Sequence, residues 1–377
     1  MQIRKMLALG VAILILTASC RSGNRAADKL AQDSSAAQQI DTNLTFNNIT
    51  IEQPDEKGQT LWKVKAKQAI YTPDKAIAKV KIPYGQLYQD GKPIYKVQAN
   101  EGEVRKDGDR IFLRGDVVAT DIRSGAVLRG EEMEWRPKRD MLVIRKNLRG
   151  THPQLKMSAD QATVFNRQRR VELVGHVVAI ATDPALQMQG EMLVWKMEKK
   201  TITSALPIQI QRLKGKQVTD NATSDKADVD LATKIVHLKQ NARLILSDPA
   251  VRVTGSSLIW SLGDQILTAD QPVTVFHQEQ QVTLTADRGK MELTPKIAYL
   301  TGNVHANGQR NQSRLTSNTL RWDISTQNIV AEGNVVYDQT NPTVNLKGPR
   351  AVGKLQNQTI VVSGGRVVTE FIPQPVP

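Results

Sequence analysis

The chain has 377 residues, with 51 Lys and Arg against 37 Asp and Glu, five His and one Cys. A single cysteine excludes intramolecular disulfides, and five scattered histidines exclude a zinc finger or zinc ribbon. The hydrophobic content of 40% excludes wholesale disorder. A net charge of +14 would suggest a nucleic-acid partner if the basic residues were clustered. They instead alternate with apolar residues, as Lys63, Lys65 and Lys67 do, so we expect a solvated sheet face and no nucleic acid.

Residues 1–20 have the pattern of an export signal. Arg4 and Lys5 precede an apolar run from residue 6 to residue 16, which as a helix would rise about 16 Å, roughly half the thickness of a bilayer core. The small residues before Cys20 resemble a bacterial lipobox, although Thr17 stands where Leu is usual. We therefore expect lipidation of Cys20 and attachment to a membrane through the N-terminus. Ordinary cleavage and a short uncleaved anchor are the alternatives.

The segments next to the N-terminal signal and at the C-terminus predict no packed structure. Residues 21–42 are rich in Ala, Ser, Gln, Asp and Arg, without a sustained apolar pattern, so we interpret them as a flexible tether. Fully extended, such a tether spans roughly 70 Å. Residues 373–377 form a proline-rich tail, and proline cannot donate to a β-ladder.

The rest of the chain repeats with a period near 60 residues and a half-period near 31. The anchors Asp160, Asp225 and Asp287 each precede a Gly-His-Val, Gln-Asn-Ala or Gly-Asn-Val segment by about 15 residues. A tryptophan follows each anchor by about 35 residues, and Asn100 begins the same frame. The tryptophans at this offset are Trp135, Trp195, Trp260 and Trp322. Repeats of this length indicate stacked supersecondary units whose apolar faces only their neighbours can cover.

Period-two alternation identifies the units as β-strands. Trp62, Val64 and Ala66 alternate with lysines, and Ile111 and Leu113 alternate with Arg110, Phe112 and Arg114. Turn formers such as Thr182-Asp183-Pro184 separate the runs. Each half-repeat therefore predicts two strands. We expect an all-β fold of roughly twenty antiparallel strands, stacked into one elongated body around a single apolar interior.

The sequence contains no motif that indicates catalysis. It lacks a phosphate-binding Gly-rich loop, and no histidine stands beside a second metal ligand at i+2 to i+4. The anchor aspartates could form a carboxylate cluster for acid–base chemistry. The equivalent positions of other repeats hold Asn100, Asn318 and Pro349, however, and acid–base chemistry seldom tolerates such replacements. We interpret the anchors as corner residues that bend a strand, and His176 as a turn residue. We expect no enzyme activity, no metal and no cofactor.

The tryptophans have two interpretations that overlap. They are core spacers, or they line an apolar groove that accepts acyl chains, each buried methylene contributing about 0.8 kcal/mol. Small residues such as Gly102 and Ala159 are expected to leave free space inside the stack. The candidate lining residues are Trp62, Val64, Ala66, Tyr71, Ala99, Val104, Leu113, Val117, Met133, Trp135, Ala162, Leu173, Val177, Leu193, Trp195, Leu258, Trp260, Leu320 and Trp322.

Two parts of the chain resemble subunits of one export machine. The region 43–121, which contains Phe46-Asn47-Asn48-Ile49, Trp62 through Tyr71 and Ala99-Asn100-Glu101-Gly102, resembles the LptC family of lipopolysaccharide export proteins. Residues 122–372, with Ala-Asp-x-Ala, Gly-Asn-Val and the regular tryptophan, resemble the LptA/OstA repeat of the same machine. An ordinary LptC is about half as long and usually has a transmembrane anchor, so the resemblance implies an extended form.

The resemblance implies a β-jellyroll open at both ends, in the periplasm and anchored to the inner membrane. It implies that lipopolysaccharide arrives from the inner-membrane ABC transporter and passes along an apolar groove toward the outer membrane. An LptA-like bridge or an LptD-type jellyroll is the implied neighbour. Two other functions stay open, a secreted β-repeat protein that binds polysaccharide and a structural envelope spacer with a filled core. The basic residues either attract anionic head groups or simply keep the outer face soluble.

Overall fold

The computed structural model describes residues 44–105, 110–310, 312–340, 343–355, 359–363 and 368–371. The expected signal, the lipidated Cys20, the tether and the proline-rich tail lie outside these residues. None of the helices in the described part of the chain has the length and apolar character needed to cross a membrane.

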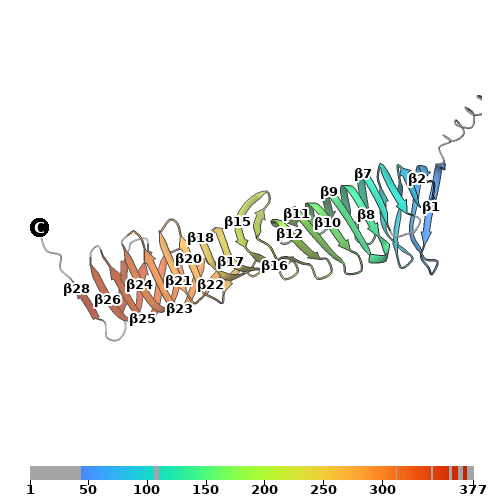
Figure 1. The fold of residues 1–377 in the computed structure, drawn as a ribbon. Helices are drawn as coiled ribbons and strands as arrows, with labels where there is room; N and C mark the ends of the chain where they lie inside the picture. The colour runs from blue at the N-terminus through green and yellow to red at the C-terminus, as the bar shows by residue number, and fades with distance from the viewer. Residues whose placement is uncertain are drawn as a thin grey trace, which may run out of the picture. The chain divides into compact units, whose positions relative to one another are not determined.

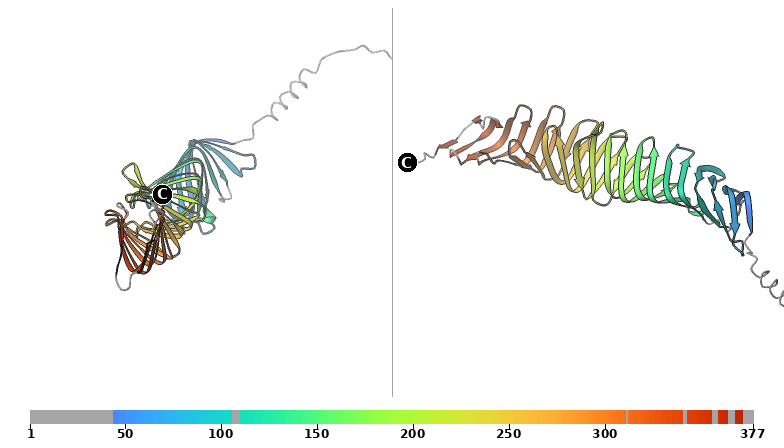
Figure 2. Two further views of the ribbon diagram at one scale, coloured as in Figure 1. Left: turned by 90° about the vertical axis from the view of Figure 1, so that its left-hand side faces the viewer. Right: turned by 90° about the horizontal axis from the view of Figure 1, so that it is seen from above.

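The described residues form 28 strands in one antiparallel sheet, with a single turn of 3-10 helix at Pro137–Arg139, so the all-β prediction is confirmed. The strands follow one another in chain order along the stack (Figure 1 and Figure 2). Their bounds are β1 Thr45–Pro54, β2 Thr60–Tyr71, β3 Ile77–Lys81, β4 Tyr84–Gln89, β5 Lys92–Gln98, β6 Glu101–Arg105, β7 Ile111–Asp121, β8 Val127–Arg136, β9 Met141–His152, β10 Leu155–Phe165, β11 Arg170–Ala181, β12 Leu186–Lys196, β13 Thr201–Ser204, β14 Ile208–Lys214, β15 Gln217–Ser224, β16 Lys226–Asp230, β17 Ile235–Ser247, β18 Ala250–Ser261, β19 Ile266–Ala269, β20 Val273–His277, β21 Val282–Ala286, β22 Arg288–Glu292, β23 Ile297–Gly308, β24 Ser313–Asp323, β25 Asn328–Gln339, β26 Val344–Lys354, β27 Thr359–Ser363 and β28 Val368–Phe371.

A row of bulges divides the long strands into two halves, and we call this row the corner. In β11, Gly175 and His176 have φ angles of 79° and 47°, and the register with β10 shifts opposite Asp160. Asp160 lies 2.9 Å from Nδ1 of His176. A bulge of this kind bends a strand and increases its twist, so the interpretation of the anchors as corner residues is confirmed.

The same contact recurs along the corner, each time between residues sixteen positions apart. Side-chain hydrogen bonds join Asn100 to Asp116 (3.0 Å), Asn241 to Asp225 (2.6 Å), Asn303 to Asp287 (2.9 Å) and Asn334 to Asn318 (3.4 Å). Elsewhere the corner interrupts a strand completely. The strand pairs divided in this way are β3/β4, β5/β6, β13/β14, β15/β16, β19/β20 and β21/β22. These divisions account for most of the difference between the expected twenty strands and the observed 28.

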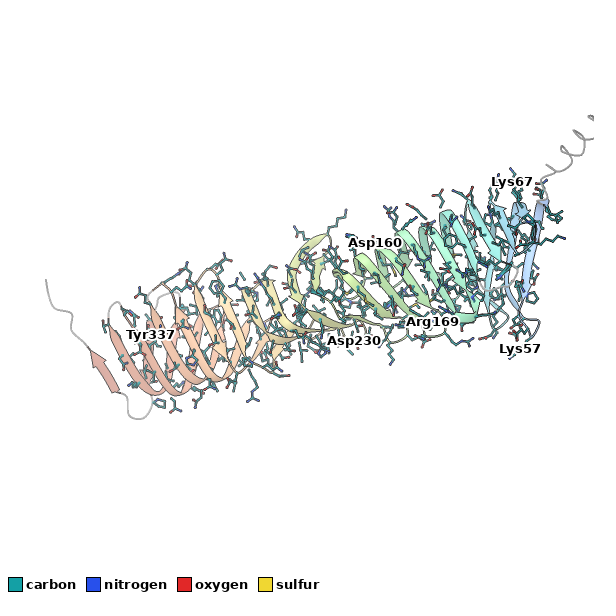
Figure 3. The ribbon with its side chains drawn as sticks, in the orientation of Figure 1. Lys57, Lys67, Asp160, Arg169, Asp230 and Tyr337 are labelled. Atoms are coloured by element: carbon teal, nitrogen blue, oxygen red, sulfur yellow. The ribbon has the colours of Figure 1, made fainter. Side chains whose placement is uncertain are left out.

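The two halves of the strands form two arms that run from the corner. Arm A ends in the turns that contain Arg169, Lys234 and Lys296, and arm B ends in the turns after β7, β11 and β17. We call the line where the tips of the arms meet the seam. Figure 3 shows Asp160 of the corner at one long edge, and Arg169 and Asp230 of arm A at the opposite edge.

Between the arms lies a continuous cluster of buried apolar side chains that extends from Trp62 to Ala351. In β2, Trp62, Val64 and Ala66 point into it and the intervening lysines point outward, as the alternation predicts. The interior is therefore a single core that runs the length of the described strands.

Candidate binding site: mouth, interior and seam

A cavity of about 460 Å³ opens at the N-terminal end of the stack, and we call it the mouth. Leu44 and Phe46 at its rim are each 44% exposed, which is unusual for large apolar side chains beside a core. The aromatic ring of Phe46 packs edge-on against Tyr71, with ring centroids 5.7 Å apart. The remaining apolar lining comes from Ile49, Ile51, Trp62, Ala76, Ala78 and Val104.

A stagger between the arms explains why the mouth is open. Arg169, in the arm A turn between β10 and β11, contacts Asp121, in the arm B turn between β7 and β8. This arm A turn thus meets an arm B turn that lies three strands earlier in the chain, where two strands divided at the corner, such as β13 and β14, count as one. Lys234 with Asp183 and Lys296 with Asp248 show the same offset. The first arm A turn, between β2 and β3, has no arm B turn that far back among the described strands. The apolar face of arm A is consequently uncovered at this end.

The predicted lining residues all face the space between the arms. Tyr71 is half-buried beside the mouth, and the other eighteen are buried, none more than 7% exposed. The structure therefore brings together every residue of the predicted set along one interior.

The expected hollow channel is absent from this state of the described strands, which is a correction. In the C-terminal half of the stack, among β18 to β23, a cavity of only about 10 Å³ lies among Val253, Leu267, Val275, Met291 and Leu300, barely the size of one water. Small residues do not leave space, because larger neighbours fill it. A Cβ added at Gly102 would lie 2.6 Å from Cδ2 of Leu113, and one at Gly150 would lie 2.7 Å from Cγ of Met157.

The seam is closed by polar contacts between the tips of the two arms. At its strongest point, Asp121 accepts hydrogen bonds from the backbone N–H of Arg123 (2.8 Å) and from Nη1 of Arg169 (3.3 Å). Just inside, the Tyr95 hydroxyl of arm B donates to Asn166 of arm A across 2.7 Å. Burial alone would raise the pKa of Asp121, but the hydrogen bonds and charge of Arg123, with Arg169, outweigh it and hold the pKa below its ordinary value.

Farther along, the seam contacts are more exposed. Lys234 lies 2.8 Å from Asp183, and Lys296 lies 2.6 Å from Asp248. Toward the N-terminal end, Arg167 contacts Asp90 at 3.0 Å. Exposed ion pairs contribute at most about 1 kcal/mol each, so this part of the seam is weakly held.

Sequence analysis missed the seam, although the repeat contains a signal for it. Asp183 and Asp248 each precede a proline in an arm B turn, a pattern that by itself predicts a turn and no ion pair. Arg169, Lys234 and Lys296 occupy one position of the arm A turns, with φ angles of 48°, 59° and 56°. The acid-to-base separation is near 50 residues in all three cases. Aligning the turns of successive repeats would have revealed it.

Two histidines of arm B pack against tryptophans just inside the seam. The ring of His152 lies 4.8 Å from that of Trp195, and His277 lies 5.4 Å from Trp322. Burial lowers the pKa of both histidines, and the charge of Arg169 adds to the effect at His152. In each, Nδ1 accepts a backbone N–H, from Gln154 and from Gln280. Both rings are therefore harder to protonate than an exposed histidine.

The described side chains gather no cluster that could hold a metal ion. Within these residues, no three His, Cys, Asp or Glu side chains come close enough to hold a metal ion. The arrangement instead provides a long apolar interior, an open apolar mouth and a weakly held seam.

Comparison with known proteins gives the family. The model described as lipopolysaccharide-assembly, LptC-related, matches residues 10–143, 140–245 and 263–367. The chain belongs to this LptC-related family. The three successive matches also show that the family unit recurs along the chain.

No sequence among curated proteins matches the chain. Among solved structures, the stack is similar to LptH of Pseudomonas aeruginosa, described as the LptA-homologous periplasmic component of the lipopolysaccharide transport device. The identity is 20% and the TM-score 0.28, over 30% of this chain and 80% of LptH.

Proposed function

We propose that this LptC-related chain is a non-enzymatic carrier that moves lipopolysaccharide across the periplasm. The N-terminus anchors it to the inner membrane, and the inner-membrane ABC transporter supplies the lipid. The chain then passes the lipid toward an LptA-like bridge or an LptD-type jellyroll. The observation that supports this most strongly is the apolar mouth, which leads into one unbroken apolar interior.

The closed interior requires the arms to part before a lipid enters. A lipid with dozens of methylenes gains about 0.8 kcal/mol for each one removed from water. Exposed seam pairs such as Asp183–Lys234 and Asp248–Lys296 contribute little against that gain. The acyl chains would then lie among the residues predicted to line the groove, while the sugars leave through the seam.

The closed interior also favours one competing function, an envelope spacer with a filled core. Photo-crosslinking distinguishes the two, because β12 places neighbouring residues on opposite faces. Leu193 is buried between the arms, whereas Val194 points to the outer face. A photo-reactive residue at 193 should give adducts with lipopolysaccharide in cells, and the matched residue at 194 should not.

A second photo-reactive residue is placed at Phe46, at the mouth. If residues 193 and 46 both give adducts with protein only, the result favours the spacer and contradicts lipid transport. Depletion of the protein gives an independent test. Newly made lipopolysaccharide should accumulate in the inner membrane, and normal delivery to the surface would contradict the proposal.

A further inference from the structure

Every tryptophan of the chain places an unpaired hydrogen-bond donor inside the stack. Trp62, Trp135, Trp195, Trp260 and Trp322 are at most 2% exposed. The indole Nε1 of each is buried without a hydrogen-bond partner. A buried N–H without an acceptor destabilises a protein, and most buried indoles have one. Five such donors within one interior call for an explanation.

Four of these donors recur at regular intervals along arm A. Trp135 and Trp195 occupy the same rung of the sheet, joined through the register partners Leu142, Val164 and Val171. Equivalent four-strand steps lead from Trp195 to Trp260 and from Trp260 to Trp322. With strands about 4.8 Å apart, successive indoles lie roughly 19 Å apart along the stack. The fifth, Trp62, stands on arm B in the lining of the mouth.

The indoles lie between the charged seam and the aliphatic interior. Trp135 packs edge-on against Tyr95, with centroids 6.3 Å apart, and the Tyr95 hydroxyl bonds to Asn166 of the seam. Toward the corner, the interior is lined by aliphatic side chains such as Leu113 and Leu173. Around Trp135, the order from seam to corner is therefore charged, aromatic and aliphatic. An amphiphile held in that order has its tails toward the corner and its head group at the seam.

Indole rings occupy the equivalent level of a membrane, where the polar linkage of a lipid meets its tails. The oxygens at that level are carbonyl oxygens of ester or amide linkages and hydroxyl groups near the carboxyl end of the chain. They accept hydrogen bonds, which is what the indole N–H groups lack. The tryptophan side chains and these oxygens are therefore complementary.

We infer that each arm A tryptophan marks one binding station, at which its Nε1–H donates to a carbonyl or hydroxyl oxygen of an acyl chain. The ligand is an acylated anionic glycolipid. Its anionic head group lies at the seam, near Arg169, Lys234 or Lys296. When the arms part, these basic side chains leave their carboxylate partners and bind the head group instead. This inference rests on the proposed function and adds the chemical group that each station recognises.

Indole resonances of the ¹⁵N-tryptophan-labelled full-length protein provide the test. The five Nε1–H signals are assigned from single Trp→Phe variants. One probe is purified lipopolysaccharide. The other is dihexadecyl phosphate, which has two long chains and an anionic head group but no acyl carbonyl or hydroxyl oxygen. Lipopolysaccharide should move the arm A indole protons downfield, as hydrogen bonding does, and dihexadecyl phosphate should not.

A matched substitution measures what the donor contributes. Benzothienylalanine introduced at Trp195 keeps the size and shape of the ring but replaces the N–H with sulfur. Affinity for lipopolysaccharide should fall about five-fold, the usual effect of one hydrogen bond, while affinity for dihexadecyl phosphate should be unchanged. The ligand-free variant should be no less stable to heat than the wild type, because it loses an unpaired donor.

Equal indole shifts with both lipids would overturn the inference, as would equal weakening of both affinities by the substitution. So would unshifted indoles in protein that crosslinks to lipopolysaccharide from residue 193. If neither lipid binds at all, the proposed function fails and this inference fails with it. The first three results contradict the stations alone.

Discussion

Replacing Asp121 by asparagine should open the seam locally far more than the same change at Asp183. Asp121 is 6% exposed at its side chain and accepts hydrogen bonds from Arg123 and Arg169. Asparagine keeps the oxygen that receives the backbone N–H of Arg123, but its amide nitrogen then faces two guanidinium groups. The variant D121N thus removes the negative charge and leaves two partly buried cations next to each other.

The expected size of the effect follows from the burial of the pair. Removing one partner of a buried ion pair costs about 3–5 kcal/mol. Because Arg123 and Arg169 retain 32% and 20% exposure, we expect a smaller loss, about 2–4 kcal/mol. That corresponds to a roughly 30- to 900-fold rise in the local opening equilibrium, at 1.36 kcal/mol per factor of ten. At Asp183, whose side chain is 72% exposed beside a Lys234 that is 40% exposed, the loss should not exceed about 1 kcal/mol.

Hydrogen exchange is the suitable assay, since a stacked repeat need not unfold in one step. Peptides that contain the turn after β7 report on the amides of Ile122 and Gly125, which donate to Ile94 and Asp121. Their exchange should accelerate in D121N, and peptides around Asp183 should change little in D183N. Equal effects in the two variants, or less than a five-fold change in D121N, would refute the view that burial makes this the strongest point of the seam.

Two other changes test the pH response and the corner. The pKa of His152 and of His277 is lowered in the folded state, so on acidification the unfolded chain binds protons before the folded chain does. The free energy of unfolding should therefore decrease as the pH is lowered from about 6.5 and become constant below the folded pKa. Thermal unfolding of H152Q/H277Q between pH 5 and 7 should show a smaller pH slope than the wild type, and an unchanged slope would contradict the assignment. At the corner, a Cβ at Gly175 would lie 2.2 Å from Oδ2 of Asp160, whereas one at Gly125 meets nothing within 4 Å. Both have positive φ angles, so G125A measures backbone strain alone, about 1–2 kcal/mol, and denaturant unfolding should show a larger loss for G175A; comparable losses would argue against a tight corner.

The strands and corners could be predicted because their causes are local. The alternation at Trp62, Val64 and Ala66 predicts which face of β2 is buried, and the neighbouring repeats show the same alternation. The anchor Asp160 and its partner His176 are sixteen residues apart, and the same spacing separates the partners of four other corner contacts. Local preference and repetition therefore pointed to the same all-β stack.

Contacts between the arms could not be predicted in the same way. Alternation identifies the apolar face of each arm but gives no information on how closely the two faces approach. The lack of a side chain at Gly102 therefore predicted free space between the arms, whereas the side chain of Leu113 on the neighbouring strand occupies that space. The pairing of Asp183 with Lys234 depends on the offset between the arms, a property of the whole stack that no single stretch of sequence contains.

The three-strand offset between the arms has a consequence for the length of such proteins. However many repeats are added or removed, arm A projects beyond arm B at the N-terminal end by the same three strands, and arm B projects at the other end. Inserting a four-strand unit thus lengthens the shaft without altering the shape of either terminus. Duplication of such a unit would therefore lengthen the stack and leave the offset between its arms unchanged.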